Sequence, residues 1–128
     1  MRVLVVEDDL DAREGLKNLL EMWGHAVDVA GNGKDGIEQA ILHRPRVALI
    51  DIGLPELDGY QVASRIREAL GSTDIFLVAI TGYADARERA HALENGFDAH
   101  VAKPIDFSKL SSILEAKKVE SAQVRVKG

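Results

Sequence analysis

The sequence predicts an α/β fold built on a five-stranded parallel β-sheet with helices on both faces. Short apolar runs, typical of strands that are buried on both faces, recur along the chain. Between these runs, apolar residues recur every three or four positions, as they do along amphipathic helices. Strict alternation of the two patterns favours parallel strands joined by right-handed crossovers. The predicted architecture is therefore a three-layer (βα)5 sandwich.

Five apolar runs are the strand candidates. They are residues 3–6, 26–29, 47–50, 75–80 and 98–102. Each run is short, as expected of strands.

The segments between and after the runs predict helices by the spacing of their apolar residues. In chain order these residues are Ala12, Leu16, Leu19, Leu20 and Trp23; Ile37, Ala40 and Ile41; Val62, Ala63, Ile66, Ala69 and Leu70; Ala86, Ala90 and Leu93; and Phe107, Leu110, Ile113 and Leu114. Asn32 and Asp58 are placed to cap the second and third helices, and Asp9 and Asp11 suit the start of the first. Gly24, Gly71 and Gly96 follow the first, third and fourth helices, as helix-terminating glycines do.

Composition and charge exclude several kinds of chemistry and partner. The 128-residue chain has no cysteine, which excludes disulfides, thiol nucleophiles and iron–sulfur clusters and fits a reducing compartment. Its net charge is −5, and residues 115–128 are net basic, so the rest is more acidic still; direct nucleic-acid binding is disfavoured. No apolar run is long enough to span a bilayer, and no signal-peptide pattern opens the chain. We therefore expect a cytoplasmic protein without membrane binding.

Polar side chains follow four of the predicted strands. Glu7 and Asp8 follow the first, Asp51 the third, Thr81 the fourth and Lys103 the fifth. Each alone would suit a helix cap or the surface. Because the carboxyl ends of parallel strands meet at one edge of a sheet, we expect these five side chains to converge there.

Three carboxylates at one edge require a compensating cation. Two unit charges about 5 Å apart repel by roughly 3 kcal/mol at an effective dielectric constant of about 20. Lys103 supplies one positive charge, and Mg²⁺, which binds oxygen ligands, suits the remainder. We expect Asp8 and Asp51 as ligands, Glu7 holding a coordinated water, and a backbone carbonyl near Gly53 completing the site.

A carboxylate next to a metal ion, an ammonium group and a hydroxyl group can attack phosphorus while the transferring oxygens are neutralised. Asp51 is the predicted nucleophile, because it ends a strand in mid-sequence and the acidic pair is expected on the neighbouring strand.

From Val3 to about Leu114 the chain resembles the receiver domains of two-component response regulators. The motifs that carry the resemblance occur in the family's order. They are Val-Leu-Val-Val-Glu7-Asp8-Asp9, Leu-Ile-Asp51-Ile-Gly-Leu-Pro55-Glu-Leu-Asp58-Gly59, Ala-Ile-Thr81-Gly and Val-Ala-Lys103-Pro104. The resemblance implies the flavodoxin-like strand order 2-1-3-4-5.

The resemblance also implies a role for each site residue. Asp51 accepts a phosphoryl group from a histidine kinase or histidine phosphotransfer protein, Glu7 and Asp8 bind Mg²⁺, Lys103 pairs with the phosphate, and Thr81 hydrogen-bonds it. Such a domain is a signalling switch rather than a turnover enzyme, and its output partner is an effector protein or a second copy of the chain. The Lys103–Pro104 bond resembles the family's cis peptide.

Three positions bear on the switch and on the lifetime of the modification. In the family, an aromatic residue three positions before the lysine fills the space behind Thr81; here this position holds His100, which is smaller and ionises near neutral pH. The alternative for His100 is a partly exposed polar residue at the sheet edge. In the family, the residues two beyond the phosphorylated Asp and two beyond the Thr tune the lifetime of the modification. Here these positions hold Gly53, which has no side chain to orient an attacking water, and Tyr83, which could shield the site, so we expect slow autodephosphorylation.

Two other functions fit parts of the sequence. Residues 31–36 match the dinucleotide-binding pattern G-x-G-x-x-G, but Asp35 would place a negative charge in a turn that must hold pyrophosphate. Haloacid-dehalogenase-like phosphatases combine similar residues, but they need a second Asp where this chain has Gly53. We assign residues 1–116 to the receiver domain; residues 117–128 either extend the last helix, fray, or begin a linker. The sequence fits both a stand-alone regulator and a receiver within a longer protein.

Overall fold

The computed structural model describes residues 1–71, 75–82 and 85–127, with side chains described up to residue 120. The strands are β1 (Arg2–Val6), β2 (Ala26–Ala30), β3 (Val47–Asp51), β4 (Phe76–Thr81) and β5 (Ala99–Ala102). The helices are α1 (Leu10–Met22), α2 (Gly33–His43), α3 (Gly59–Leu70), α4 (Ala86–Glu94) and α5 (Phe107–Lys127). Strands and helices alternate along the whole chain, as predicted.

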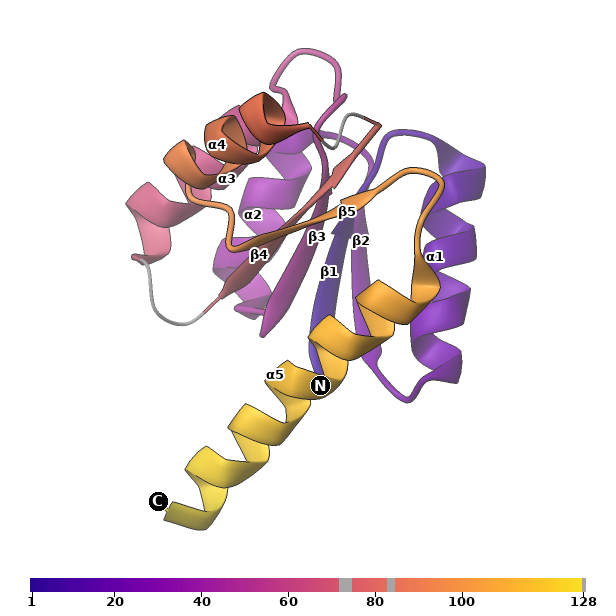
Figure 1. Ribbon diagram of the computed structural model, residues 1–128, viewed down its shortest axis with the longest axis vertical. Helices are drawn as coiled ribbons and strands as arrows, with labels where there is room; N and C mark the ends of the chain where they lie inside the picture. Colours follow the sequence, from indigo (N-terminus) through magenta and orange to yellow (C-terminus); the bar gives the residue numbers. More distant parts are fainter. Residues whose placement is uncertain (72–74, 83–84, 128) are drawn as a thin grey trace.

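The strands form one parallel sheet in the order β2-β1-β3-β4-β5, which confirms the predicted topology (Figure 1). The chain runs from β1 outward to β2 and then returns across β1 to β3, so the strand order reverses between β1 and β3. Val6 pairs with Ile50 in the register of these two strands. The residues that follow, Glu7 and Asp51, therefore emerge side by side at the carboxyl edge.

Two apolar cores cover the two faces of the sheet, because alternate residues of each strand point to opposite sides. On one face, Val5 and Leu49 pack with Leu20 of α1 and Leu110 of α5. On the other face, the buried strand residues pack with α2, α3 and α4, which Figure 1 shows gathered on that side. Burial of each large aliphatic side chain contributes about 1.5–3 kcal/mol, so these cores stabilise the sheet that carries the site.

The prediction of which residues form the buried face of α4 is wrong. Ala90 is exposed and Leu93 is 65% exposed, whereas Ala92 is buried. Phe97, just beyond the helix, is also buried and supplies apolar area that the helix itself lacks. Short alanine side chains carry too little apolar surface to fix which side of a helix turns inward.

Helix caps occur where the sequence predicts them. The side chains of Asp9, Asn32 and Asp58 accept hydrogen bonds from the backbone N–H groups of Ala12, Asp35 and Gln61, respectively. Asp58 and Gln61 form a reciprocal capping box, with the Gln61 side chain accepting from the Asp58 N–H. This box fixes the start of α3 just after the loop that follows Asp51.

The glycines of residues 31–36 have a packing role. A Cβ atom at Gly33 would lie 2.7 Å from Val62 Cγ2, and one at Gly36 would lie 2.8 Å from Val6 Cγ2. The two glycines thus let α2 approach α3 and β1 closely. The pattern that suggested dinucleotide binding is explained by helix packing.

Residues 117–127 continue α5, and Figure 1 shows the end of this helix extending past the sheet. The Lys117 ammonium lies 4.1 Å from the centroid of the Phe76 ring, and Arg46 lies 3.8 Å from Glu120. These contacts attach α5 to the sheet as far as residue 120. Within the described part of the chain, no helix has the length and apolarity needed to cross a membrane.

Candidate functional site

The polar residues predicted at the strand ends lie at one edge of the sheet. Asp51 ends β3, Thr81 ends β4, and Glu7 and Lys103 immediately follow β1 and β5. Asp51 and Thr81 are buried at 7% and 6% exposure, so the carboxylate and the hydroxyl belong to a recessed site. Lys103 donates its backbone N–H to the Thr81 carbonyl at 2.8 Å, which fixes the ends of β4 and β5 together.

Asp51 is held by donors on two sides. Its Oδ1 accepts a hydrogen bond from Lys103 Nζ at 3.0 Å and another from the Gly53 N–H at 3.0 Å. Burial opposes ionisation, but hydrogen bonds from Glu7, Gly53 and Lys103 together hold the pKa of Asp51 below its usual value. Asp51 is therefore an ionised carboxylate at neutral pH.

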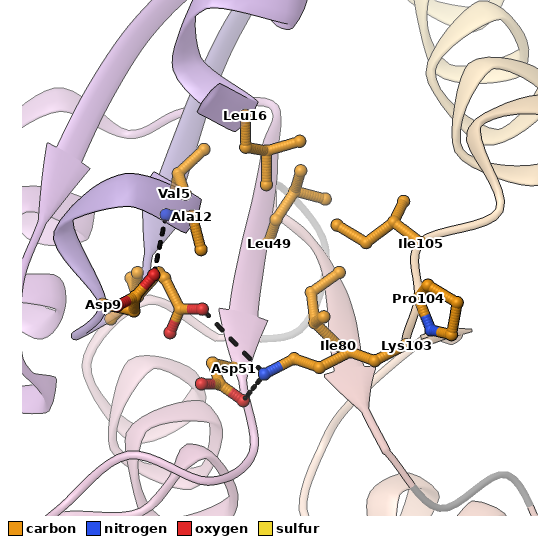
Figure 2. A pocket seen from close by; sticks show the side chains of 12 residues that line it. Val5, Asp9, Ala12, Leu16, Leu49, Asp51, Ile80, Lys103, Pro104 and Ile105 are labelled. Atoms are coloured by element: carbon orange, nitrogen blue, oxygen red, sulfur yellow. Dashed lines mark hydrogen bonds and ion pairs between the residues drawn. The ribbon is translucent and has the colours of Figure 1, made fainter. Parts of the chain in front are cut away.

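Lys103 reaches into the site from the connection between β5 and α5 (Figure 2). Its Nζ lies 3.0 Å from Asp51 Oδ1 and 3.9 Å from Glu7 Oε1, so one ammonium faces carboxylates from two strands. Burial lowers its pKa, but Asp51 and Glu7 outweigh that effect and raise the pKa of Lys103 overall. The Lys103–Pro104 peptide bond is cis, as the resemblance implies.

Glu7 is a carboxyl group whose ionised form is poorly stabilised in the metal-free site. Its Oε2 is buried and has no hydrogen-bond partner in the described part of the chain. Burial, together with the neighbouring Asp51 carboxylate, raises the pKa of Glu7 to about 8. A carboxyl group in this condition favours binding of an added cation, which would stabilise its ionised form.

The donor set fits a hard divalent cation. Oxygen atoms of Glu7, Asp8 and Asp51 all lie within 4.8 Å of one another, and carboxylate oxygens are the ligands that Mg²⁺ prefers. The acidic cluster can therefore hold a metal ion. Gly53, the predicted source of a carbonyl ligand, lies next to Asp51 and donates its N–H to it.

A cavity of about 400 Å³ opens beside these groups, between α1 and the β5–α5 connection. Figure 2 shows apolar side chains at its wall, among them Leu16, Leu49 and Ile105, with Asp51 and Lys103 at its polar end. Asp9 also borders the cavity, but its side chain caps α1 as predicted. The Asp51 carboxylate thus borders a cavity that opens on this side.

His100 lies on β5 opposite Ala79 of β4 and lines a small cavity together with Thr81. Burial and the positive charges of Lys109 and Arg89 lower the pKa of His100, which favours the neutral ring. Tyr83, expected to shield the site, lies outside the described residues. Tyr60, which no sequence pattern singled out, lines the same small cavity; the signal that could have found it is its place directly after the Asp58-Gly59 motif.

Curated relatives share most of this chain. It is 34% identical over 115 residues to an uncharacterized 14.6 kDa protein of Leptolyngbya boryana, covering 90% of this chain and 88% of that protein. It is 32% identical over 125 residues to the transcriptional regulatory protein DltR of Streptococcus agalactiae, covering 98% of this chain. The chain spans only 55% of DltR, so DltR contains a further region.

Solved structures share the fold. The N-terminal domain of an uncharacterized protein from Wolinella succinogenes matches with a TM-score of 0.84 and 31% identity, covering 96% of this chain and 98% of that one. The receiver domain of a sensor histidine kinase from Pseudomonas aeruginosa, solved with a magnesium ion in its active site cleft, matches with a TM-score of 0.80 and 28% identity, covering 90% and 94%. A sequence model described as the response regulator receiver domain matches residues 3–115. The chain therefore belongs to the receiver domain family of two-component response regulators.

Proposed function

We propose that this receiver domain works in a phosphorelay in which Asp51 accepts a phosphoryl group from the phosphohistidine of a histidine kinase or histidine phosphotransfer protein. The supporting observation is the buried Asp51 carboxylate, held 3.0 Å from the Lys103 ammonium and next to two further acids. In the transfer, an Asp51 oxygen forms a bond to phosphorus. The bond between phosphorus and the imidazole nitrogen breaks, and that nitrogen keeps the electron pair.

The side chains around Asp51 have different roles in the transfer. Hydrogen bonds keep Asp51 ionised, so that an oxygen lone pair is available for attack. Lys103 exchanges its contact with the carboxylate for one with a phosphoryl oxygen and neutralises charge there. Thr81, at the end of the adjacent strand, hydrogen-bonds another phosphoryl oxygen.

The same edge supplies a magnesium site. Asp8 and Asp51 would bind the ion, and Glu7 would hold it directly or through a coordinated water. The Gly53 carbonyl would complete the set. Bound Mg²⁺ would neutralise charge on the phosphoryl oxygens. The magnesium ion in the receiver domain of the Pseudomonas aeruginosa kinase supports this assignment.

Modification of Asp51 acts as a switch. An acyl phosphate adds charge and acceptor oxygens at the site and draws Thr81 inward. Because His100 and α4 lie behind Thr81, the surface of α4 and β5 changes with it. An effector protein or a second copy of the chain recognises that surface.

The modification is long-lived, and the protein does not turn over a substrate. Gly53 has no side chain that could orient a water molecule toward phosphorus. Slow loss of the phosphoryl group suits a signalling domain, which we place in the cytoplasm with its kinase.

Intact mass spectrometry tests the proposal. Incubation with Mg²⁺ and acetyl phosphate should add one phosphoryl group to the wild-type chain and none to Asp51→Asn. Asp9→Asn is the matched control, because asparagine caps helices as well as aspartate does; it should be modified as the wild type is. Unmodified wild type, or a modified Asp51→Asn variant, would disprove the assignment.

A further inference from the structure

The start of α3 is fixed directly against the backbone of Asp51. A Cβ atom at Gly59 would lie 2.5 Å from the Asp51 carbonyl oxygen and 2.6 Å from the Cα atom of Ile52. The Gly59 N–H donates to the Ile52 carbonyl at 3.1 Å. No side chain separates the two segments, so the backbone at Asp51 is in direct contact with the start of α3, where Tyr60 follows Gly59.

Tyr60 bridges from α3 to α4. Its hydroxyl donates a hydrogen bond to Glu88 Oε2, and its ring contacts the His91 ring edge-on, with the centroids 4.1 Å apart. The centroid of the Tyr60 ring also lies 6.3 Å from that of Phe97, which follows the C-terminal end of α4. Figure 1 shows α3 and α4 on the same face of the sheet. The Tyr60 side chain, at the start of α3, thus contacts two residues of α4.

Little apolar surface of α4 is buried within the described part of the chain. Ala92 is the only residue of this helix that is buried, and Leu93 projects into solvent. A methyl group provides little apolar surface, so polar and ring contacts add to the attachment of this helix. A hydrogen bond to a charged acceptor such as Glu88 is among the stronger contacts available to such a helix.

Tyr60 also fills the space behind Thr81. Tyr60, Thr81, Glu88 and His100 line a cavity of about 10 Å³, hardly enough for one water molecule. Thr81 therefore cannot move inward unless one of the groups behind it moves. Displacement of Asp51 thus reaches Tyr60 by two routes, through the backbone of Gly59 and through the side chain of Thr81.

We propose that Tyr60 is a positioning residue that couples the state of Asp51 to α4, through its hydrogen bond to Glu88 and its ring contact with His91. In the unmodified protein these contacts hold α4 against α3. Modification of Asp51 displaces Tyr60, breaks the contact with Glu88 and releases α4 for a partner. The inference rests on the proposed function and adds to it, because it assigns the coupling to a residue of α3 rather than to His100 alone.

Hydrogen exchange of the α4 amides, Ala86–Glu94, tests this coupling, with intact mass recorded on the same samples. Acetyl phosphate in excess with Mg²⁺ keeps the protein modified. In the wild type, modification should speed exchange in α4. Tyr60→Phe keeps the ring and loses the hydroxyl. Before modification, its α4 amides should exchange about fivefold faster than those of the unmodified wild type. Modification should then change their exchange rate by less than about twofold.

Two substitutions at Glu88 separate a signalling contact from a structural one. Glu88→Gln keeps an acceptor and should retain the wild-type response, whereas Glu88→Ala should behave as Tyr60→Phe does. Arg87→Gln, on an exposed position of the same helix, should leave the response unchanged.

The proposal is overturned if Tyr60→Phe becomes modified and its α4 amides respond as those of the wild type do. It is also overturned if His100→Ala abolishes the response while Tyr60→Phe retains it. If intact mass shows no modification of the wild type, the phosphorelay function itself is refuted, and the coupling with it.

Discussion

The Lys103 ammonium donates to Asp51 Oδ1 at 3.0 Å, although the two residues are 52 positions apart in the sequence. The same ammonium lies 3.9 Å from Glu7 Oε1. Lys103 therefore offsets the repulsion between carboxylates from β1 and β3, and in the proposed function it would contact a phosphoryl oxygen on Asp51.

Loss of the Lys103 charge should slow modification of Asp51. In Lys103→Met we expect the rate of phosphoryl acceptance from acetyl phosphate to fall about a hundredfold, as when one preorganised charge-stabilising donor is removed. Quenched time points analysed by intact mass measure this rate. Lys34→Met, at an exposed position of α2, should keep the wild-type rate. Equal rates in both variants would contradict the role of Lys103.

Removal of Asp8 should weaken metal binding and modification together. Saturation at 100 times Kd with Mg²⁺ should raise the free energy of unfolding of the wild type by about 2.7 kcal/mol. Asp8→Ala should lose this gain at the same Mg²⁺ concentration and remain folded without it, whereas Asp9→Asn should keep the gain. Urea unfolding with and without Mg²⁺ provides the measurement, and an undiminished gain in Asp8→Ala would exclude Asp8 as a ligand.

The stability of the metal-free protein should depend on the ionisation of Glu7. Burial and Asp51 raise its pKa from 4.5 to about 8. The folded state therefore binds a proton that the unfolded state has lost, and the stabilisation present below pH 4.5 declines as the pH rises to about 8. The pKa of Asp51 is shifted downward, so its contribution is lost only under more acidic conditions, outside this window.

Glu7→Gln isolates this effect because it removes the ionisable group and keeps the shape of the side chain. Urea unfolding in a metal chelator should show a flatter dependence on pH between 5 and 8 than in the wild type. At pH 8 the variant should be more stable than the wild type by more than about 1 kcal/mol. Parallel curves for the two proteins would show that Glu7 is not the group responsible.

Much of this site could be predicted from the sequence because its chemistry is attached to strand ends. Each strand run predicts where a polar residue emerges, and parallel strands end on one edge. Asp51 and Lys103 follow from that rule alone. The caps at Asn32 and Asp58 were equally accessible, because capping depends on residues three positions apart.

Other features depend on contacts that no local pattern specifies. Tyr60 and Glu88 are 28 positions apart and meet only because α3 and α4 cover the same face. The inward side of α4 was predicted wrongly because its alanines carry little signal. The high pKa of Glu7 likewise follows from burial between neighbours on the sheet, which spacing along the chain does not reveal.

Replacing each of two glycines with alanine should have opposite effects on the free energy of unfolding. Gly59→Ala places a Cβ 2.5 Å from the Asp51 carbonyl oxygen, so we expect a loss of about 1–3 kcal/mol in the free energy of unfolding and slower modification. Gly15→Ala, in α1 with no atom within 4 Å of the new Cβ, should gain about 0.5–1 kcal/mol. Chemical denaturation checks both values, and equal stability of the two variants would refute the close approach at Gly59.

Arg67 should stabilise the N-terminal end of β4. Its guanidinium donates to the Ile75 carbonyl at 2.7 Å, to the Gly96 carbonyl at 3.0 Å and to Asp98, whose carboxylate also accepts the Leu77 N–H. Arg67→Met should lower the free energy of unfolding by about 2–3 kcal/mol. Arg65→Met, on the exposed side of the same helix, should change it by less than about 0.5 kcal/mol. A comparable loss in both variants would argue against this role.

Chemical trapping of the modified residue tests the central claim most directly. Borohydride reduces an acyl phosphate to an alcohol, so treatment after incubation with Mg²⁺ and acetyl phosphate should convert residue 51 to homoserine. Peptide mapping should locate the reduced residue at position 51 alone, and only when both reagents are present. Reduction at another acidic residue, or none at any, would contradict the assignment of Asp51 as the phosphoryl acceptor.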